Sequence, residues 1–110
     1  CEAQIEIQRV TYPVSNDPDL AALMKTVIED LDTHAVVDKT HQTMGAEDFS
    51  FMMRDIPGCF VMIGSANPEK NLDYPHHHPK FNIDESCLPY AVALIAKGAI
   101  EILEKNPKSV

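Results

Sequence analysis

The sequence predicts an α/β fold, because its hydrophobic pattern alternates along the chain between the period of strands and that of helices. The predicted order is strand, helix, strand, short helix, strand, long loop and helix, which is typical of a mainly parallel sheet covered by helices. Three strands are few for a sheet that stands alone. With 110 residues and Cys rather than Met at its first position, the chain is expected to be a processed product or a piece of a longer protein.

The first part of the chain predicts a strand, a helix and a second strand. Residues 4–10 alternate between apolar and polar side chains, which favours a half-buried strand. Residues 18–31 carry an apolar stripe at helical spacing, with Asp17 as the N-cap and Pro18 at the first helical position. Residues 35–37 form a short apolar run typical of a strand. The helical stripe consists of Leu20, Leu23, Met24, Val27, Ile28 and Leu31.

The middle of the chain predicts a short helix, a buried strand and a long loop. Residues 47–54 form the helix, whose acidic first residues suit a helix N-terminus. Residues 59–63 are continuously apolar and lie between two glycines, which favours a strand buried on both faces. Residues 65–80 contain several Xaa-Pro pairs and are expected to form a loop, and loops of this length are usually functional or mobile.

The last predicted element is a helix that begins near residue 85 or 88 and ends at Lys105. Asp84 or Ser86 can cap it, and Asn106-Pro107 is expected to stop it. Its expected buried face consists of Leu88, Ala91, Val92, Ile95, Ala99, Ile102 and Leu103.

Acidic residues outnumber basic ones by 17 to 9, which gives a net charge of −8. Binding to nucleic acid and docking on anionic membranes both need clustered Lys and Arg, so the composition argues against both. No apolar run is expected to span a bilayer. The three cysteines are odd in number and form no CxxC pair, which argues against a disulfide framework. We therefore expect reduced thiols in a cytoplasmic protein.

The most unusual feature is the run of His76, His77 and His78 between Pro75 and Pro79. Neutral imidazole is a common ligand for transition metals. Neighbouring side chains on an extended backbone point in opposite directions, so one of the three, or two after a bend, can bind the same ion. The alternative is a solvated polar loop that holds histidines without binding a metal.

A second candidate site lies where Gly45 precedes the predicted helix of residues 47–54. Glycine allows the backbone to approach a ligand closely, and free N–H groups at a helix start favour an anion. The alternative is a plain turn followed by Glu47 and Asp48. The sequence contains no GxSxG, Walker or GxGxxG motif, and Cys59 lies in an apolar run that makes it a poor nucleophile.

Four segments occur in a fixed order: MGAEDFSF (44–51), PGCFVMIG (57–64), HHHPKFNIDE (76–85) and LPYAVAL (88–94). Together they resemble the C-terminal part of the two-domain metal-dependent amidohydrolases. That family includes hippurate hydrolases, N-acyl-amino-acid amidohydrolases, N-acetyldiaminopimelate deacetylases and auxin-conjugate hydrolases.

The resemblance also implies a division of the chain. The segment YPVSNDPDL (12–20) is similar to the point where the family's chain leaves a small lid domain and re-enters the catalytic domain. Residues 1–14 would then be the end of the lid, including its last strand. Residues 15–110 would be the C-terminal part of a zinc-peptidase-like catalytic domain, a mixed sheet with flanking helices.

The resemblance implies a site with two divalent metal ions, which are zinc, manganese, cobalt or nickel. The ions activate water to cleave the amide bond of N-acyl amino acids, such as hippurate-like or N-acetyl substrates. In the family motif the metal-binding His lies two residues before a Pro, which makes it His77 here, with Pro79 and Phe81 as the anchors. His76 and His78 fall at positions that are not expected to bind metal.

The segment Gly45, Ala46 and Glu47 is similar to the family segment that lines the substrate cleft. The general base and the other metal ligands lie in an N-terminal region that this chain does not contain. We therefore expect no catalytic residue in this chain and no activity from it alone. The rest of the parent chain is an implied partner, and the lid implies a homodimer.

Two other readings stay open at the level of sequence. One is a small acidic α/β module that binds a metal or a partner without catalysis. The other is a purely structural piece of the parent enzyme without a metal role.

Overall fold

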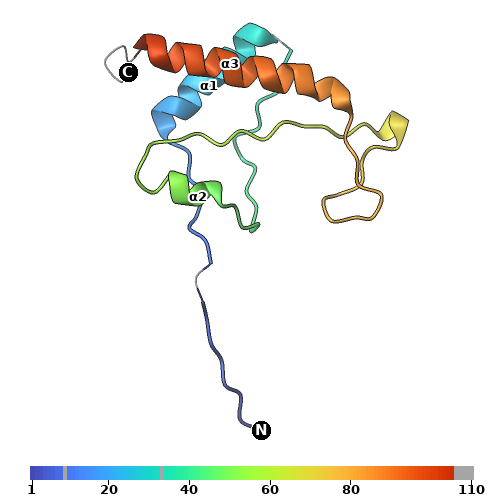
Figure 1. Cartoon of the computed structure of the whole chain (residues 1–110). Helices are drawn as coiled ribbons and strands as arrows, with labels where there is room; N and C mark the ends of the chain where they lie inside the picture. The colour runs from blue at the N-terminus through green and yellow to red at the C-terminus, as the bar shows by residue number, and fades with distance from the viewer. Residues whose placement is uncertain (9, 33, 106–110) are drawn as a thin grey trace.

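The computed structural model describes residues 1–8, 10–32 and 34–105. Its elements are the helix α1 (Pro18–Leu31), the short helix α2 (Phe49–Met52), the 3₁₀ turns η1 (Pro68–Lys70) and η2 (Glu85–Cys87), and the long helix α3 (Leu88–Lys105). Figure 1 shows α3 lying across α1, while α2 and the connecting segments run beside them.

Helix α1 has the first residue and the N-cap that the sequence predicts. The Asp17 carboxylate accepts hydrogen bonds from the backbone N–H groups of Asp19 and Leu20, both at 3.0 Å. These two groups have no partner within the helix, so the cap stabilises its first turn. All six residues of the predicted stripe are buried or half-buried, and Val27 is 1% exposed.

Helix α3 begins at Leu88, directly after the turn η2. The Asp84 side chain accepts a hydrogen bond from the backbone N–H of Ser86 at 3.1 Å, so Asp84 rather than Ser86 is the cap. The predicted stop at Asn106-Pro107 lies outside the described residues.

The core of the chain is the contact between α1 and α3. Val27 of α1 and Leu94 of α3 are each 1% exposed. Gly98 lets the two helices approach closely, because a Cβ atom there would lie 2.7 Å from the Sδ of Met24. At the rim of this contact, Lys97 Nζ forms an ion pair with Asp30 at 3.1 Å.

The predicted buried face of α3 is wrong: none of its seven residues is buried, and only Ala91 and Ile102 among them are half-buried. Val92 and Ile95 are 68% and 70% exposed, whereas the buried residues are Leu94 and Gly98. The helix is apolar on two sides, and helical periodicity cannot say which side a neighbour covers. In this chain α1 covers the side of Leu94 and leaves the other apolar side open.

Because α3 carries apolar residues on two sides, residues 85–105 have a mean hydropathy of 1.5. By length and composition this helix is long and apolar enough to cross a membrane, contrary to the sequence expectation of no such segment. This is weak evidence, because core helices of soluble proteins pass the same test.

The predicted sheet is absent from the part of the chain that the structure describes. Residues 4–10, 35–37 and 59–63 were expected to be strands, but no strand occurs in residues 1–8, 10–32 and 34–105. An isolated antiparallel bridge joins Asn67 and Leu72. A strand needs the backbone groups of a neighbouring strand as partners, and α1 and α3 offer none.

Two further expectations need correction. The predicted helix of residues 47–54 is only the four-residue α2, so Glu47 and Asp48 lie before it. The predicted loop of residues 65–80 contains the turn η1.

The chain is extended for its length. Its radius of gyration is 17.7 Å, and its longest dimension is 61 Å. A compact domain of this length has a radius of gyration of about 13 Å. Figure 1 shows the N-terminal segment running away from the helices, and there Ile5 and Ile7 are 81% and 90% exposed.

Candidate functional site

The histidine run lies in two consecutive turns. The backbone N–H of His78 donates to the carbonyl of Pro75 at 3.2 Å, and that of Phe81 donates to the carbonyl of His78 at 2.9 Å. The first turn consists of residues 75–78, and His77 is its third residue, with a φ of 67°. A type II turn requires positive φ at this position, which is uncommon for residues other than Gly. The chain is therefore bent sharply at His77.

The bend separates the three imidazole rings. The ring of His78 stacks on Tyr74 with centroids 4.4 Å apart, and its Nδ1 accepts the backbone N–H of Lys80 at 3.1 Å. The ring of His76 packs edge-on against Phe81 at 4.8 Å. Both of these imidazoles are therefore engaged within the loop.

His77 differs from its neighbours. Its side chain is exposed, and among the described residues no hydrogen bond or ring contact engages it. An imidazole binds a metal through one unprotonated ring nitrogen, and no described contact occupies either ring nitrogen of His77. The donor chemistry of His77 therefore fits the metal that the family motif implies.

A single imidazole does not make a metal centre. No group of three or more His, Cys, Asp or Glu residues suited to a metal occurs among the described residues. A zinc site needs about four ligands, and the described residues do not assemble such a set around His77.

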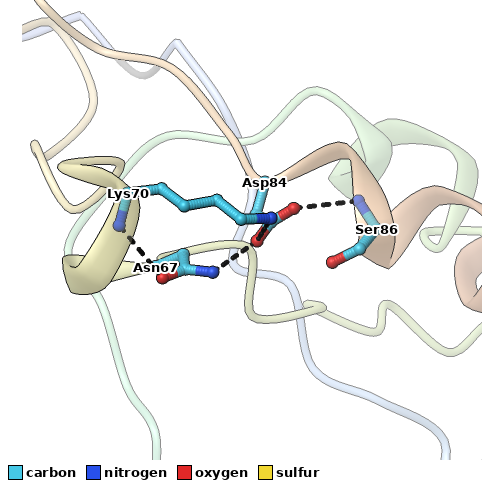
Figure 2. A network of polar contacts seen from close by, with 4 residues as sticks. All are labelled: Asn67, Lys70, Asp84 and Ser86. Carbon is cyan, nitrogen blue, oxygen red and sulfur yellow. Dashed lines mark hydrogen bonds and ion pairs between the residues drawn. The ribbon is translucent and has the colours of Figure 1, made fainter.

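A polar network closes the base of the histidine loop (Figure 2). The Oδ2 atom of Asp84 accepts hydrogen bonds from Asn67 Nδ2 at 2.5 Å and from Lys70 Nζ at 2.9 Å. Its Oδ1 atom accepts the backbone N–H of Ser86. Donation by Lys70, Asn67 and Ser86 holds the pKa of the Asp84 carboxyl well below its usual range. Asp84 therefore stays ionised while it is only 9% exposed.

The predicted substrate-binding segment, Gly45 to Glu47, lies just before α2 in the structure. Gly45 and Ala46 are exposed, and the backbone N–H of Gly45 donates to Thr43 Oγ1 at 3.1 Å. The carboxylate of Glu47 is half-buried and accepts the backbone N–H of Phe49 at 3.1 Å. Glu47 thus caps α2, which supports the alternative of a turn with acidic capping residues. A role of this segment in substrate binding stays a prediction.

The two predicted sites are not brought together within this chain. His77 belongs to the loop beyond η1, whereas Gly45, Ala46 and Glu47 precede α2. Among the described residues, no hydrogen bond, ion pair or ring contact joins them.

The surroundings of Cys59 agree with the expectation that it is a poor nucleophile. Cys1, Cys59 and Cys87 are all free. Partial burial, aided by the carboxylate of Asp17, raises the pKa of the Cys59 thiol. Cys59 is therefore protonated at neutral pH and is a poor nucleophile.

Sequence reasoning missed the role of Asp84 in the loop. It named Asp84 among several acid/base candidates but preferred a helix cap as its role, and it assigned no role to the side chains of Lys70 and Asn67. The spacing Asn67-Pro-Glu-Lys70 was a usable signal, because Asn is a good cap for a turn that begins with Pro.

Comparison with known proteins places the chain in a family. A model of the peptidase family M20/M25/M40 matches residues 2–101. The IAA-amino acid hydrolase ILR1-like 6 of Arabidopsis thaliana is 38% identical over 105 residues, which cover 90% of this chain and 22% of that protein. An N-acetyldiaminopimelate deacetylase of Streptococcus gordonii is 32% identical, with 87% of this chain and 24% of the relative covered.

Thermostable carboxypeptidase 2 of Saccharolobus solfataricus is 29% identical over 93% of this chain and 25% of its own length. The chain thus spans about a quarter of the length of the curated relatives it matches. No solved structure gives a significant match. Because the family model covers nearly all of the sequence, the chain belongs to the peptidase family M20/M25/M40.

Proposed function

We propose that the chain is the C-terminal part of a metal-dependent amidohydrolase that cleaves N-acyl amino acids. Membership of the M20/M25/M40 peptidase family supports hydrolysis in general. Relatives named as an IAA-amino acid hydrolase and an N-acetyldiaminopimelate deacetylase support the substrate class, because both names describe cleavage of an acyl group from an amino acid.

In this proposal His77 is the residue of this chain that binds metal. The observation that carries it is the contrast between the free ring of His77 and the engaged rings of His76 and His78. When bound, divalent ions supply an activated water molecule and polarise the amide carbonyl. His77 contributes one neutral nitrogen ligand, and its exposed side chain makes no described contact with the packed rings of the same loop.

Several parts of the proposal concern the longer protein. The general base and the other ligands are proposed to lie in its N-terminal region, so this chain alone should not hydrolyse substrates. Dimerisation through the lid domain and a cytoplasmic location also stay predictions, as does the identity of the two ions among zinc, manganese, cobalt and nickel.

The substrate class can be tested on the full-length protein that contains this chain. The protein would be loaded with each of the four metals in turn and assayed with hippurate, with N-acetyl amino acids and with an unblocked dipeptide. We expect hydrolysis of the N-acyl compounds, and we expect a chelator to abolish it. A carboxypeptidase among the relatives makes the dipeptide the relevant competitor, and cleavage of the dipeptide alone would contradict the proposal.

The role of His77 can be tested in the same protein. His77→Ala should lower both the affinity for metal and kcat/KM by at least about 100-fold, since even residues that only support a ligand cost 10–100-fold. His76→Phe is the matched control, because it removes an adjacent imidazole and keeps a ring against Phe81. Unchanged metal affinity in His77→Ala, or an equal loss in His76→Phe, would refute the assignment.

A further inference from the structure

We propose that Asp84 is a positioning residue for His77, because its carboxylate joins the two ends of the loop that carries His77. This inference rests on the proposed function, in which His77 binds metal. It assigns a role to the network of Figure 2 that helix capping alone does not explain.

The Asp84 carboxylate uses its two oxygens for different tasks. Oδ1 accepts the backbone N–H of Ser86 and caps the start of η2, which leads into α3. Oδ2 accepts hydrogen bonds from the side chains of Asn67 and Lys70 at the other end of the loop. Asn67 is the N-cap of the turn η1, and Lys70 is its last residue. Figure 2 shows the Lys70 and Asn67 side chains converging on this one oxygen. Capping therefore needs only the Oδ1 atom of Asp84, and its Oδ2 atom fixes the other end of the loop.

The ends of the loop are held by backbone contacts as well. The backbone N–H of Asp84 donates to the carbonyl of Ser65 at 2.9 Å. Asn67 and Leu72 exchange two backbone hydrogen bonds, both at 2.9 Å. The two ends of the segment of residues 73–83 are therefore held close together, and Asp84 lies where they meet.

Between these ends, the hydrogen bonds and ring contacts found among the described residues stay within the loop. The hydrogen bonds and ring contacts of residues 73–83 all join residues of the same segment. The stacked rings of Tyr74 and His78 stiffen the loop internally, but they do not fix it against α3. The orientation of His77 relative to the rest of the chain is thus set where the two ends of the loop meet. There Asp84 accepts hydrogen bonds from both ends.

The charge of Asp84 explains why these particular donors are needed where the two ends of the loop meet. Asp84 is 9% exposed, so its negative charge needs the three donors that surround it. Lys70 supplies the only charged donor among the described residues that contact it, while its own side chain is 59% exposed. Loss of Lys70 would therefore loosen the loop without opening a hole in the core.

The chain offers variants that separate the two tasks. Asp84→Asn keeps an oxygen that can cap η2, but it turns an NH₂ group toward the donors Asn67 and Lys70. Lys70→Met removes the charged donor and leaves the cap untouched, whereas Lys70→Arg keeps a charged donor. Asp55→Asn is the surface control, because Asp55 forms an exposed ion pair with Arg54 at 3.0 Å and has no contact with the loop.

The test is a metal titration of the full-length protein, with Zn²⁺ competed against a chromophoric chelator. Asp84→Asn and Lys70→Met should each lower the Zn²⁺ affinity by about tenfold or more, and kcat should recover at saturating Zn²⁺. Lys70→Arg should restore most of the affinity, and Asp55→Asn should leave it unchanged. Thermal unfolding of the metal-free variants reports any loss of folding separately.

The outcomes distinguish this inference from the proposed function. If His77→Ala loses Zn²⁺ affinity while Asp84→Asn and Lys70→Met keep it within twofold, only the positioning role is overturned. If excess Zn²⁺ does not restore kcat in Lys70→Met, the network acts through folding and the positioning role is likewise overturned. If His77→Ala itself binds Zn²⁺ as the unchanged protein does, both proposals fail. Should Asp84→Asn not fold, the comparison of Lys70→Met with Lys70→Arg decides.

Discussion

Asp17 and Asp84 stand before the two long helices, and each accepts backbone N–H groups that no helical carbonyl can reach. They differ in their surroundings. The Asp17 carboxylate accepts only local backbone donors, whereas that of Asp84 also holds the side chains of Asn67 and Lys70. The hydrogen bonds of the Asp17 carboxylate are thus local, whereas those of the Asp84 carboxylate also reach side chains far away in the sequence.

The cap of α1 can be tested by removing its acceptor. Asp17→Ala should lower the free energy of unfolding by about 1 kcal/mol, because the N–H groups of Asp19 and Leu20 lose their partner. Asp17→Asn keeps a capping oxygen and should cost much less. Denaturant unfolding measures both, and equal losses in the two variants would show that charge rather than capping stabilises this end.

The lowered pKa of Asp84 predicts how its contribution depends on pH. A carboxyl group whose pKa is lower in the folded than in the unfolded state stabilises the fold above its unfolded pKa, about 3.9. This stabilisation is lost as the pH falls from there through the folded pKa. The difference in thermal midpoint between the metal-free full-length protein and its Asp84→Asn variant should therefore be constant from pH 7 to pH 5 and shrink below pH 4. A difference that does not change with pH would contradict this account.

Local patterns were enough to predict some of these roles. Asp17 was predicted as a cap from its place before Pro18, and Asp84 was one of two candidates for the second cap. The bonds from Asn67 and Lys70 to Asp84 cross 17 and 14 residues of sequence, and no local pattern contains them. The free ring of His77 was also beyond local reasoning, because it depends on which neighbours the turn places against Phe81 and Tyr74.

At the scale of elements, the contact of α1 with α3 depends on a missing side chain. Gly98 is buried in the middle of α3, where glycine is otherwise unfavourable by about 1 kcal/mol relative to Ala. A Cβ atom there would lie 2.7 Å from the Sδ of Met24 and 3.0 Å from its Cε. Both atoms belong to the flexible end of Met24, so a small addition can be accommodated and a larger one cannot.

Substitution at Gly98 should therefore depend on size. Gly98→Ala should be close to neutral, because the gain in helix propensity offsets the displacement of Met24. Gly98→Val should destabilise the protein by about 1–3 kcal/mol through overpacking. In a Met24→Ala background, Gly98→Ala should become stabilising, and denaturant unfolding of the double-mutant cycle would reveal this coupling. Strict additivity would show that the two residues do not compete for space.

Helices were easier to predict than strands for a physical reason. A helix satisfies its backbone groups internally, so the first residue and the N-cap of α1 followed from its own residues. Residues 59–63 have the composition of a buried strand, but a strand is completed by a neighbour that this chain does not provide. The predicted α/β class therefore rests on family membership, and the mixed sheet stays a prediction for the longer protein.

At the scale of the molecule, much apolar surface is uncovered. Val92 and Ile95 on α3 are as exposed as the residues of a binding surface, and Ile5, Ile7 and Val36 are more exposed still. Single exposed apolar residues are ordinary, but an open stripe along a helix is a surface for packing. We interpret this stripe as a packing surface of α3 that α1 leaves uncovered.

This interpretation predicts the behaviour of the isolated chain. Expressed alone, the 110 residues should bind the dye ANS strongly and unfold over a broad range of temperature, because the α1 and α3 pair provides little core. The full-length protein should bind little ANS and unfold sharply. Fluorescence titration and a thermal melt of both proteins make the comparison, and a sharp melt without ANS binding in the isolated chain would argue for an independent module.

One side-chain contact has a consequence for how a strand could pair with residues 59–63. Asn16 donates to the backbone carbonyl of Phe60 at 2.9 Å and accepts its backbone N–H at 2.8 Å, as a neighbouring strand would. In an extended chain both backbone groups of a residue face the same edge, and those of the next residue face the opposite edge. Asn16 therefore blocks one edge of the segment at Phe60. An incoming strand must pair with the other edge, through Cys59 and Val61, so a single asparagine fixes the side from which a sheet can grow.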